Sequence, residues 1–127
     1  MPLQLEVIRA TEFIRLGAQG QFDLAASKEA LRTLAIACQK RALNHAILDL
    51  RALHPGPKPV FSVEDLRELV GTFSEVGFSK ELRLAILYES DPHKRARMFA
   101  FLSNMKGWNV GAFSEFEEAM LWLSVRE

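Results

Sequence analysis

The basic run at residues 93–97, His-Lys-Arg-Ala-Arg, is the part of the sequence best suited to binding chemistry. It follows Asp91 and Pro92, and this pair predicts a helix with Asp91 as N-cap and Pro92 at the first helical position. Basic side chains beside the free N–H groups of a helix N-terminus would bind a phosphate or a carboxylate. The alternative is a solvated charge run that pairs with Glu89 and Asp91. The predicted anion-binding residues are His93, Lys94 and Arg97.

Other chemically active residue types lack the neighbours that their chemistry needs. His45, His54 and His93 are far apart, and none has a second ligand at helical or hairpin spacing, so we predict no metal site. Cys38 has no basic or polar company on its expected helix, so we interpret it as a small core residue; the alternative is a reactive thiol. No Gly-x-Ser-x-Gly elbow is present. We therefore predict no catalytic residue, no cofactor and a protein that is not an enzyme.

The composition indicates one globular domain that covers residues 1–127. Sixteen basic residues balance sixteen acidic ones, which argues against a nucleic-acid partner. No apolar run approaches the roughly 20 residues that cross a bilayer, and the first residues do not follow the pattern of a signal peptide. Cys38 is the single cysteine, which fits a reducing compartment. We expect a cytoplasmic protein without membrane insertion.

The hydrophobic periodicity changes repeatedly between that of strands and that of helices. Two alternating runs at residues 3–8 and 13–16 predict a hairpin, followed by a turn around Gly17 and Gly20. The remaining chain alternates helices with short apolar strands. The predicted helices begin near residues 26, 62, 91 and 114, and the later strands lie near residues 45–50, 82–88 and 108–113. The order β-β-α-β-α-β-α-β-α predicts an α/β protein, with a mostly parallel sheet of about five strands and four helices.

Two of the expected helices carry more apolar residues than one buried face requires. Phe99, Phe101 and Met105 crowd the helix that follows the basic run, and Trp122 lies off the apolar stripe of the last helix. We interpret these four residues as a dimer interface or as an apolar pocket between the last two helices. The alternative is a wide helix face buried against the sheet.

Four phrases spread along the sequence are similar to those of one known family. They are Gly20-Gln21-Phe22-Asp23-Leu24, Ala46-Ile47-Leu48-Asp49-Leu50-Arg51, Leu84-Ala85-Ile86-Leu87 and Glu118-Ala119-Met120-Leu121-Trp122-Leu123. With these phrases the chain resembles, over nearly its whole length, the STAS domain, the fold of bacterial anti-sigma factor antagonists, and its SpoIIAA-like branch of small stand-alone proteins. The resemblance implies a STAS-like α/β fold and a regulatory binding role.

The phosphorylation motif of the antagonists is incomplete in this sequence. Their Asp-Ser-Ser/Thr-Gly motif corresponds to residues 60–65, where Ser62 takes the place of the phosphoserine but lacks the preceding aspartate and the following glycine. Ser62 and Asp65 also form the pattern of a capping box at a helix start, which accounts for the serine without phosphorylation.

The strand near residues 45–50 also resembles the phospho-acceptor strand of response-regulator receivers. The acidic pair and the lysine that receivers need are missing, so we interpret Asp49 as a strand-end residue that bonds nearby backbone. The sequence as a whole predicts a non-enzymatic, STAS-like binding module whose partner is another protein or a second copy of itself. The alternative is a carrier or sensor of a small anionic or lipid-like molecule.

Overall fold

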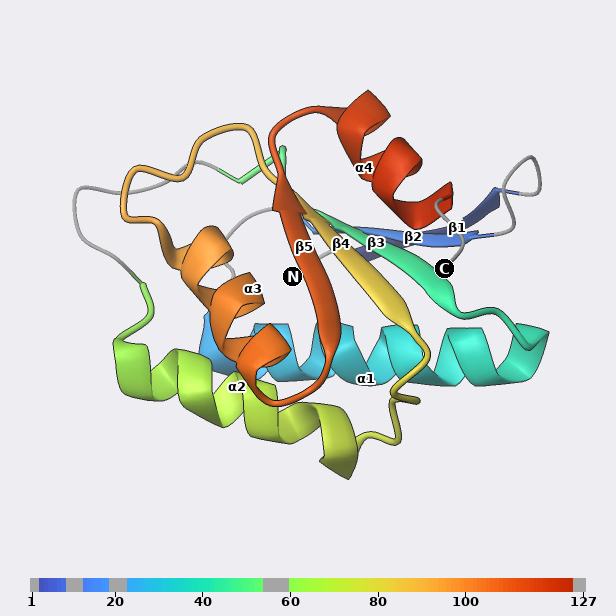
Figure 1. The fold of residues 1–127 in the computed structure, drawn as a ribbon, viewed down its shortest axis with the longest axis horizontal. Helices are drawn as coiled ribbons and strands as arrows, with labels where there is room; N and C mark the ends of the chain where they lie inside the picture. The colour runs from blue at the N-terminus through green and yellow to red at the C-terminus, as the bar shows by residue number, and fades with distance from the viewer. Residues whose placement is uncertain (1–2, 9–12, 19–22, 54–59, 125–127) are drawn as a thin grey trace.

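The computed structural model describes residues 3–8, 13–18, 23–53 and 60–124, which form one sheet with helices on both faces (Figure 1). The strands are β1 (Leu3–Ile8), β2 (Phe13–Ala18), β3 (His45–Asp49), β4 (Arg83–Leu87) and β5 (Asn109–Phe113). The helices are α1 (Leu24–Arg41), α2 (Val63–Glu75), α3 (Arg95–Met105) and α4 (Phe116–Ser124). The predicted order of elements is confirmed, and so is the α/β class.

The strands lie in the sheet in the order in which they occur in the chain. β1 pairs antiparallel with β2, which confirms the predicted hairpin, while β2, β3, β4 and β5 run parallel. Three helices connect successive parallel strands. Because such crossovers are right-handed and the strands are added in one direction, α1, α2 and α3 all lie on the same face of the sheet.

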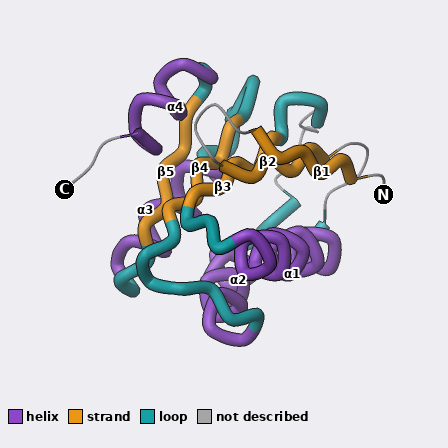
Figure 2. Tube along the Cα trace, turned by 90° about the vertical axis from the view of Figure 1, so that its right-hand side faces the viewer, coloured by secondary structure: helices purple, strands orange, loops and turns teal. Residues whose placement is uncertain are grey.

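The fourth helix lies on the opposite face, as Figures 1 and 2 show. It packs on β4 and β5 and covers a second, smaller core that includes Phe13, Ile47 and Leu123. The larger core lies between the sheet and α1–α3, and includes Leu48 and Phe73. Adjacent residues Ile47 and Leu48 therefore belong to different cores, because successive side chains of a strand point to opposite faces.

Local capping explains where two of the helices begin. Asp23 caps α1 by accepting from the N–H of Ala26 at 2.9 Å. Ser62 caps α2: its hydroxyl accepts from the N–H of Asp65 at 3.1 Å, and the Asp65 carboxylate accepts from the N–H of Ser62 at 3.0 Å. The predicted capping box is confirmed.

Two predicted boundaries are wrong. Gly17 lies inside β2, beside Asp49 of β3, and not in a turn. α3 begins at Arg95, one turn later than expected, so Pro92 is not its first residue. The cause is Lys94, whose backbone adopts the left-handed conformation with φ of 58° and interrupts the helix before Arg95. Gly20 lies outside the described residues.

Candidate functional site

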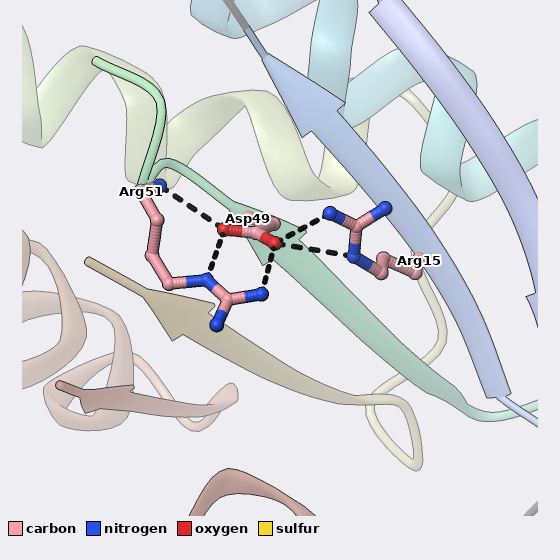
Figure 3. A network of polar contacts seen from close by, with 3 residues as sticks. All are labelled: Arg15, Asp49 and Arg51. Carbon is pink, nitrogen blue, oxygen red and sulfur yellow. Dashed lines mark hydrogen bonds and ion pairs between the residues drawn. The ribbon is translucent and has the colours of Figure 1, made fainter. Parts of the chain in front are cut away.

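A buried carboxylate holds two arginines together at the carboxyl end of β3 (Figure 3). The Asp49 side chain is 4% exposed, and its Oδ2 atom accepts from Arg15 Nε at 3.1 Å, Arg15 Nη2 at 2.6 Å and Arg51 Nη2 at 2.9 Å. Its Oδ1 atom accepts from the backbone N–H and the Nε of Arg51, both at 3.0 Å. We call Arg15, Asp49 and Arg51 the Asp49 clamp.

The strand register brings the members of the Asp49 clamp together. Gly17 of β2 lies beside Asp49 and has no side chain to fill the adjacent space. Arg15 lies two residues before Gly17, so its side chain points to the same face of the sheet and reaches the carboxylate. Arg51 lies two residues after the end of β3, and its guanidinium lies 5.9 Å from the centre of the Phe116 ring at the start of α4. The clamp thus connects β2, β3 and α4.

The electrostatics of the clamp favour the charged form of Asp49 at neutral pH. Burial disfavours its ionised form, but hydrogen bonds from Arg51 and Arg15 outweigh that effect and hold the pKa of Asp49 below its ordinary value. The hydrogen bond to Asp49 in turn raises the pKa of Arg51. A carboxylate that accepts five hydrogen bonds and stays ionised is suited to holding the two arginines in place.

The sequence predicted part of this arrangement. The expected backbone bond of Asp49 is confirmed by the N–H of Arg51. Neither arginine was singled out, and both are functional candidates that sequence reasoning missed. For Arg51 a signal existed, because an aspartate followed two residues later by arginine at a strand end permits both a turn and an ion pair. Arg15 lies 34 residues from Asp49 and gave no such signal.

At the predicted anion site, a carboxylate of the chain itself, that of Asp91, binds Arg97 and two backbone N–H groups. The Oδ1 atom of Asp91 accepts from the N–H of Ala96 at 3.2 Å. Its Oδ2 atom accepts from the N–H of Arg97 at 3.3 Å and from Arg97 Nε at 3.1 Å. Asp91 therefore occupies the N-terminus of α3, where a bound anion was expected. Arg97 pairs with Asp91, as the alternative interpretation predicted, and binding of an external anion by His93, Lys94 and Arg97 stays a prediction.

The four residues predicted to form an interface or a pocket do not lie together. Phe99 is buried in the larger core, where its ring lies 5.7 Å from that of Phe73. Trp122 belongs to α4, on the opposite face of the sheet, and the centre of its ring lies 5.5 Å from that of Phe113. A pocket between the last two helices is therefore wrong, because α3 and α4 lie on opposite faces of the sheet.

Phe101 and Met105 remain as a pair on the solvent-facing side of α3. They are 63% and 67% exposed and lie one helical turn apart, with Arg97 one turn before Phe101. Two further exposed cations lie at either end of this stretch. We call these residues the α3 outer face: Lys94, Arg97, Phe101, Met105 and Lys106.

Cys38 and Ser62 fit structural roles. Cys38 is buried in the larger core, which confirms the expected core position, and burial raises its pKa to about 11 although Arg41 lowers it in part. Ser62 is exposed and committed to the capping box; its phosphorylation stays a prediction. Residues 54–59, which include His54 and three prolines, lie outside the described residues.

Among the described residues, no group of three His, Cys, Asp or Glu side chains could hold a metal ion, and no helix has the length and apolarity to cross a membrane. A hollow of about 120 Å³ lies between α1 and the loop after α2, beside Cys38 and Gly77. This volume is well below the roughly 300–1,000 Å³ of ligand pockets.

The fold and these surfaces define an open α/β sheet with a charged clamp at its carboxyl edge and an exposed apolar pair on a peripheral helix. Neither a model of a known protein family nor a curated protein sequence matches the chain.

Proposed function

We propose that this chain is a non-enzymatic, STAS-like binding module that engages a protein partner through the α3 outer face. The observation that carries the proposal is the exposure of Phe101 and Met105, which lie on one side of a helix whose other side is already buried. Phe99, Ala100 and Ser103 provide that buried side. A phenylalanine and a methionine one turn apart form an apolar strip of the kind that a partner covers.

The residue types of the α3 outer face favour a protein as the partner. Aromatic residues, methionine and arginine are enriched in protein–protein interfaces, while lysine is depleted in their centres and tolerated at their rims. Phe101 and Met105 follow Arg97 at intervals of one turn, with Lys94 before this row and Lys106 directly after it. This arrangement corresponds to an apolar centre with a charged border.

The STAS-like part of the proposal is supported by the resemblance described above together with the element order of the fold. The central phrase of that resemblance, residues 46–51, contains two members of the Asp49 clamp. We propose that the clamp fixes the start of the loop that follows β3, and that the module works in the cytoplasm of a bacterium.

The alternative role, as a carrier of an anionic or lipid-like molecule, has less support. The carboxylate of Asp91 already accepts from the first N–H groups of α3 and from Arg97, so an incoming anion would have to displace it. Displacement would also separate two opposite charges in a partly buried setting, which is unfavourable.

The test compares two surface variants of equal design. Phe101→Ser/Met105→Ser removes the apolar centre of the α3 outer face, and Val60→Ser, which lies outside α3 and α4, removes an equally exposed apolar residue as a control. Tagged wild type and both variants are used as baits in the host, followed by binding measurements with each purified protein that the wild type enriches. We expect the control to retain at least half of the wild-type affinity and the double variant to lose about tenfold or more. Equal affinities of all three baits would contradict the proposal.

A further inference from the structure

Opposite charges gather on the two helices that lie on opposite faces of the sheet. Residues 91–106 contain four Lys or Arg residues and one carboxylate, whereas residues 114–124 contain three Glu and no Lys or Arg. The glutamates of this second stretch, Glu115, Glu117 and Glu118, are all exposed. The chain is neutral as a whole, and the fold places these two oppositely charged segments on opposite faces of the sheet.

Each charged surface also has an exposed apolar side chain within it. On α4, Leu121 is 69% exposed and lies one helical turn after Glu117 and Glu118. We call Glu117, Glu118 and Leu121 the α4 outer face. It is acidic with an apolar residue, and the α3 outer face is basic with an apolar pair. The two faces are therefore complementary in both respects.

The fold prevents these two faces from meeting within one molecule. α3 packs on β5 from one side of the sheet, while α4 packs on β4 and β5 from the other side (Figure 1). The sheet and both cores lie between them. Because they lie on opposite sides of one molecule, these two charged faces can pair with each other only between different molecules.

We propose that the α3 outer face of one copy docks on the α4 outer face of a second copy, in a head-to-tail arrangement. This inference rests on the proposed function, because it names a second copy as the protein that the α3 outer face engages. Phe101 and Met105 contact Leu121 of the neighbouring copy, and Lys94 and Lys106 lie near its glutamates. The contact is heterologous, because it joins two different surfaces. A chain of copies therefore always has an unpaired α3 outer face at one end and an unpaired α4 outer face at the other, so assembly continues beyond a dimer.

The lengths of the helices limit the strength of this contact. α3 has eleven residues and α4 has nine, which correspond to about 16 and 13 Å of helix. Two helices of that length bury less area than a standard stable interface, so we expect dissociation constants on the order of 100 μM. Assembly therefore depends on local concentration.

Sedimentation velocity over about 10 to 500 μM protein tests the inference with the wild type and with one variant of each outer face. Wild type is expected to form species larger than a dimer as its concentration rises. Phe101→Ser/Met105→Ser and Leu121→Ser are each expected to remain monomeric. A 1:1 mixture of these two variants contains one intact face of each kind, so it should form a heterodimer and stop there.

Charge reversal provides a second measurement that does not depend on the apolar residues. Glu117→Lys/Glu118→Lys and Lys94→Glu/Lys106→Glu should each be monomeric alone, since both outer faces then carry the same sign. Mixing them should restore association. Raising the salt concentration from about 0.1 to 1 M shortens the Debye length from about 10 to 3 Å and should weaken wild-type assembly about tenfold. Thermal melts confirm that every variant is folded.

The outcomes separate this inference from the proposed function. A wild type that stops at a dimer, together with a Leu121→Ser variant that still dimerises, would show contact between two α3 outer faces and overturn head-to-tail docking. A wild type that stays monomeric up to about 500 μM would also overturn it. In both cases the binding role of the α3 outer face would still be decided by the bait experiment.

Discussion

Two aspartates at the carboxyl edge of the sheet, Asp49 and Asp91, both hold arginines, yet they do so in different ways. Asp49 ends a central strand, is 4% exposed and joins two arginines that come from different parts of the fold. Asp91 lies in a loop, its side chain is 9% exposed, and its partners lie within six residues of it. Asp49 connects secondary-structure elements that are distant in the sequence, and Asp91 stabilises the N-terminus of a single helix.

The difference shows that a similar degree of burial can serve two purposes. Removing Asp49 affects β2, β3 and the loop after β3 together, because Arg15 and Arg51 both depend on it. Removing Asp91 affects the first turn of α3, because the Asp91 carboxylate accepts hydrogen bonds from two N–H groups of that turn. We therefore expect variants of the two aspartates to differ in size of effect and in how the effect depends on pH.

The largest effect is expected from Asp49→Ala. This change leaves two guanidiniums close together without the carboxylate between them, and losing one partner of a buried ion pair costs about 3–5 kcal/mol. Arg51 is 42% exposed, so we expect a loss of about 3 kcal/mol in the free energy of unfolding. Urea denaturation followed by circular dichroism measures it. A loss below about 1 kcal/mol would show that the Asp49 clamp does not stabilise the fold.

The pH dependence of stability is expected to distinguish Asp49 in a second way. Its pKa is lowered in the folded protein, so the unfolded chain binds the proton more readily near its ordinary pKa of about 3.9. The stabilisation is therefore fully present above that value and is lost as the pH falls through the folded pKa. We expect the stability difference between wild type and Asp49→Asn to be constant from about pH 5 to 7 and to shrink below about pH 4. A difference that grows on acidification would contradict this assignment.

The contrast between the two aspartates also separates the features that the sequence predicts from those that it does not. Periodicity and capping patterns predicted every helix and strand, because Ser62 with Asp65 and the apolar runs of the strands are local signals. The backbone bond of Asp49 was predictable for the same reason. Its bond to Arg15 depends on the register between β2 and β3, which a single sequence does not specify.

The position of α4 could not be predicted by the rule that places the other helices. α1, α2 and α3 each connect two parallel strands, so the handedness of the crossover assigns them to one face. α4 follows β5, and the described residues contain no strand after α4, so that rule leaves its face undetermined. The mistaken pocket between Phe99 and Trp122 came from this missing constraint.

A smaller effect is expected from Asp91→Ala, since it removes a helix cap and one partly exposed ion pair. Loss of a capping side chain costs about 1–2 kcal/mol, and urea denaturation should report a loss in that range. Asp91→Asn keeps an oxygen that accepts from Ala96 but removes the charge that pairs with Arg97. Asp91→Asn should therefore recover about half or more of the free energy of unfolding that Asp91→Ala loses, because exposed ion pairs contribute about 0.2–1 kcal/mol.

The control for this prediction is the exposed pair between Glu29 and Arg32 on α1, which has no capping role. Arg32→Ala should change the free energy of unfolding by about 0.5 kcal/mol or less. If Asp91→Ala fell in the same range as Arg32→Ala, the carboxylate of Asp91 would not be needed to start α3. It would then be free to give way to an external anion, and the predicted site at His93, Lys94 and Arg97 would regain support. A loss of about 1–2 kcal/mol instead means that an anion must compete with a bond on which the helix depends.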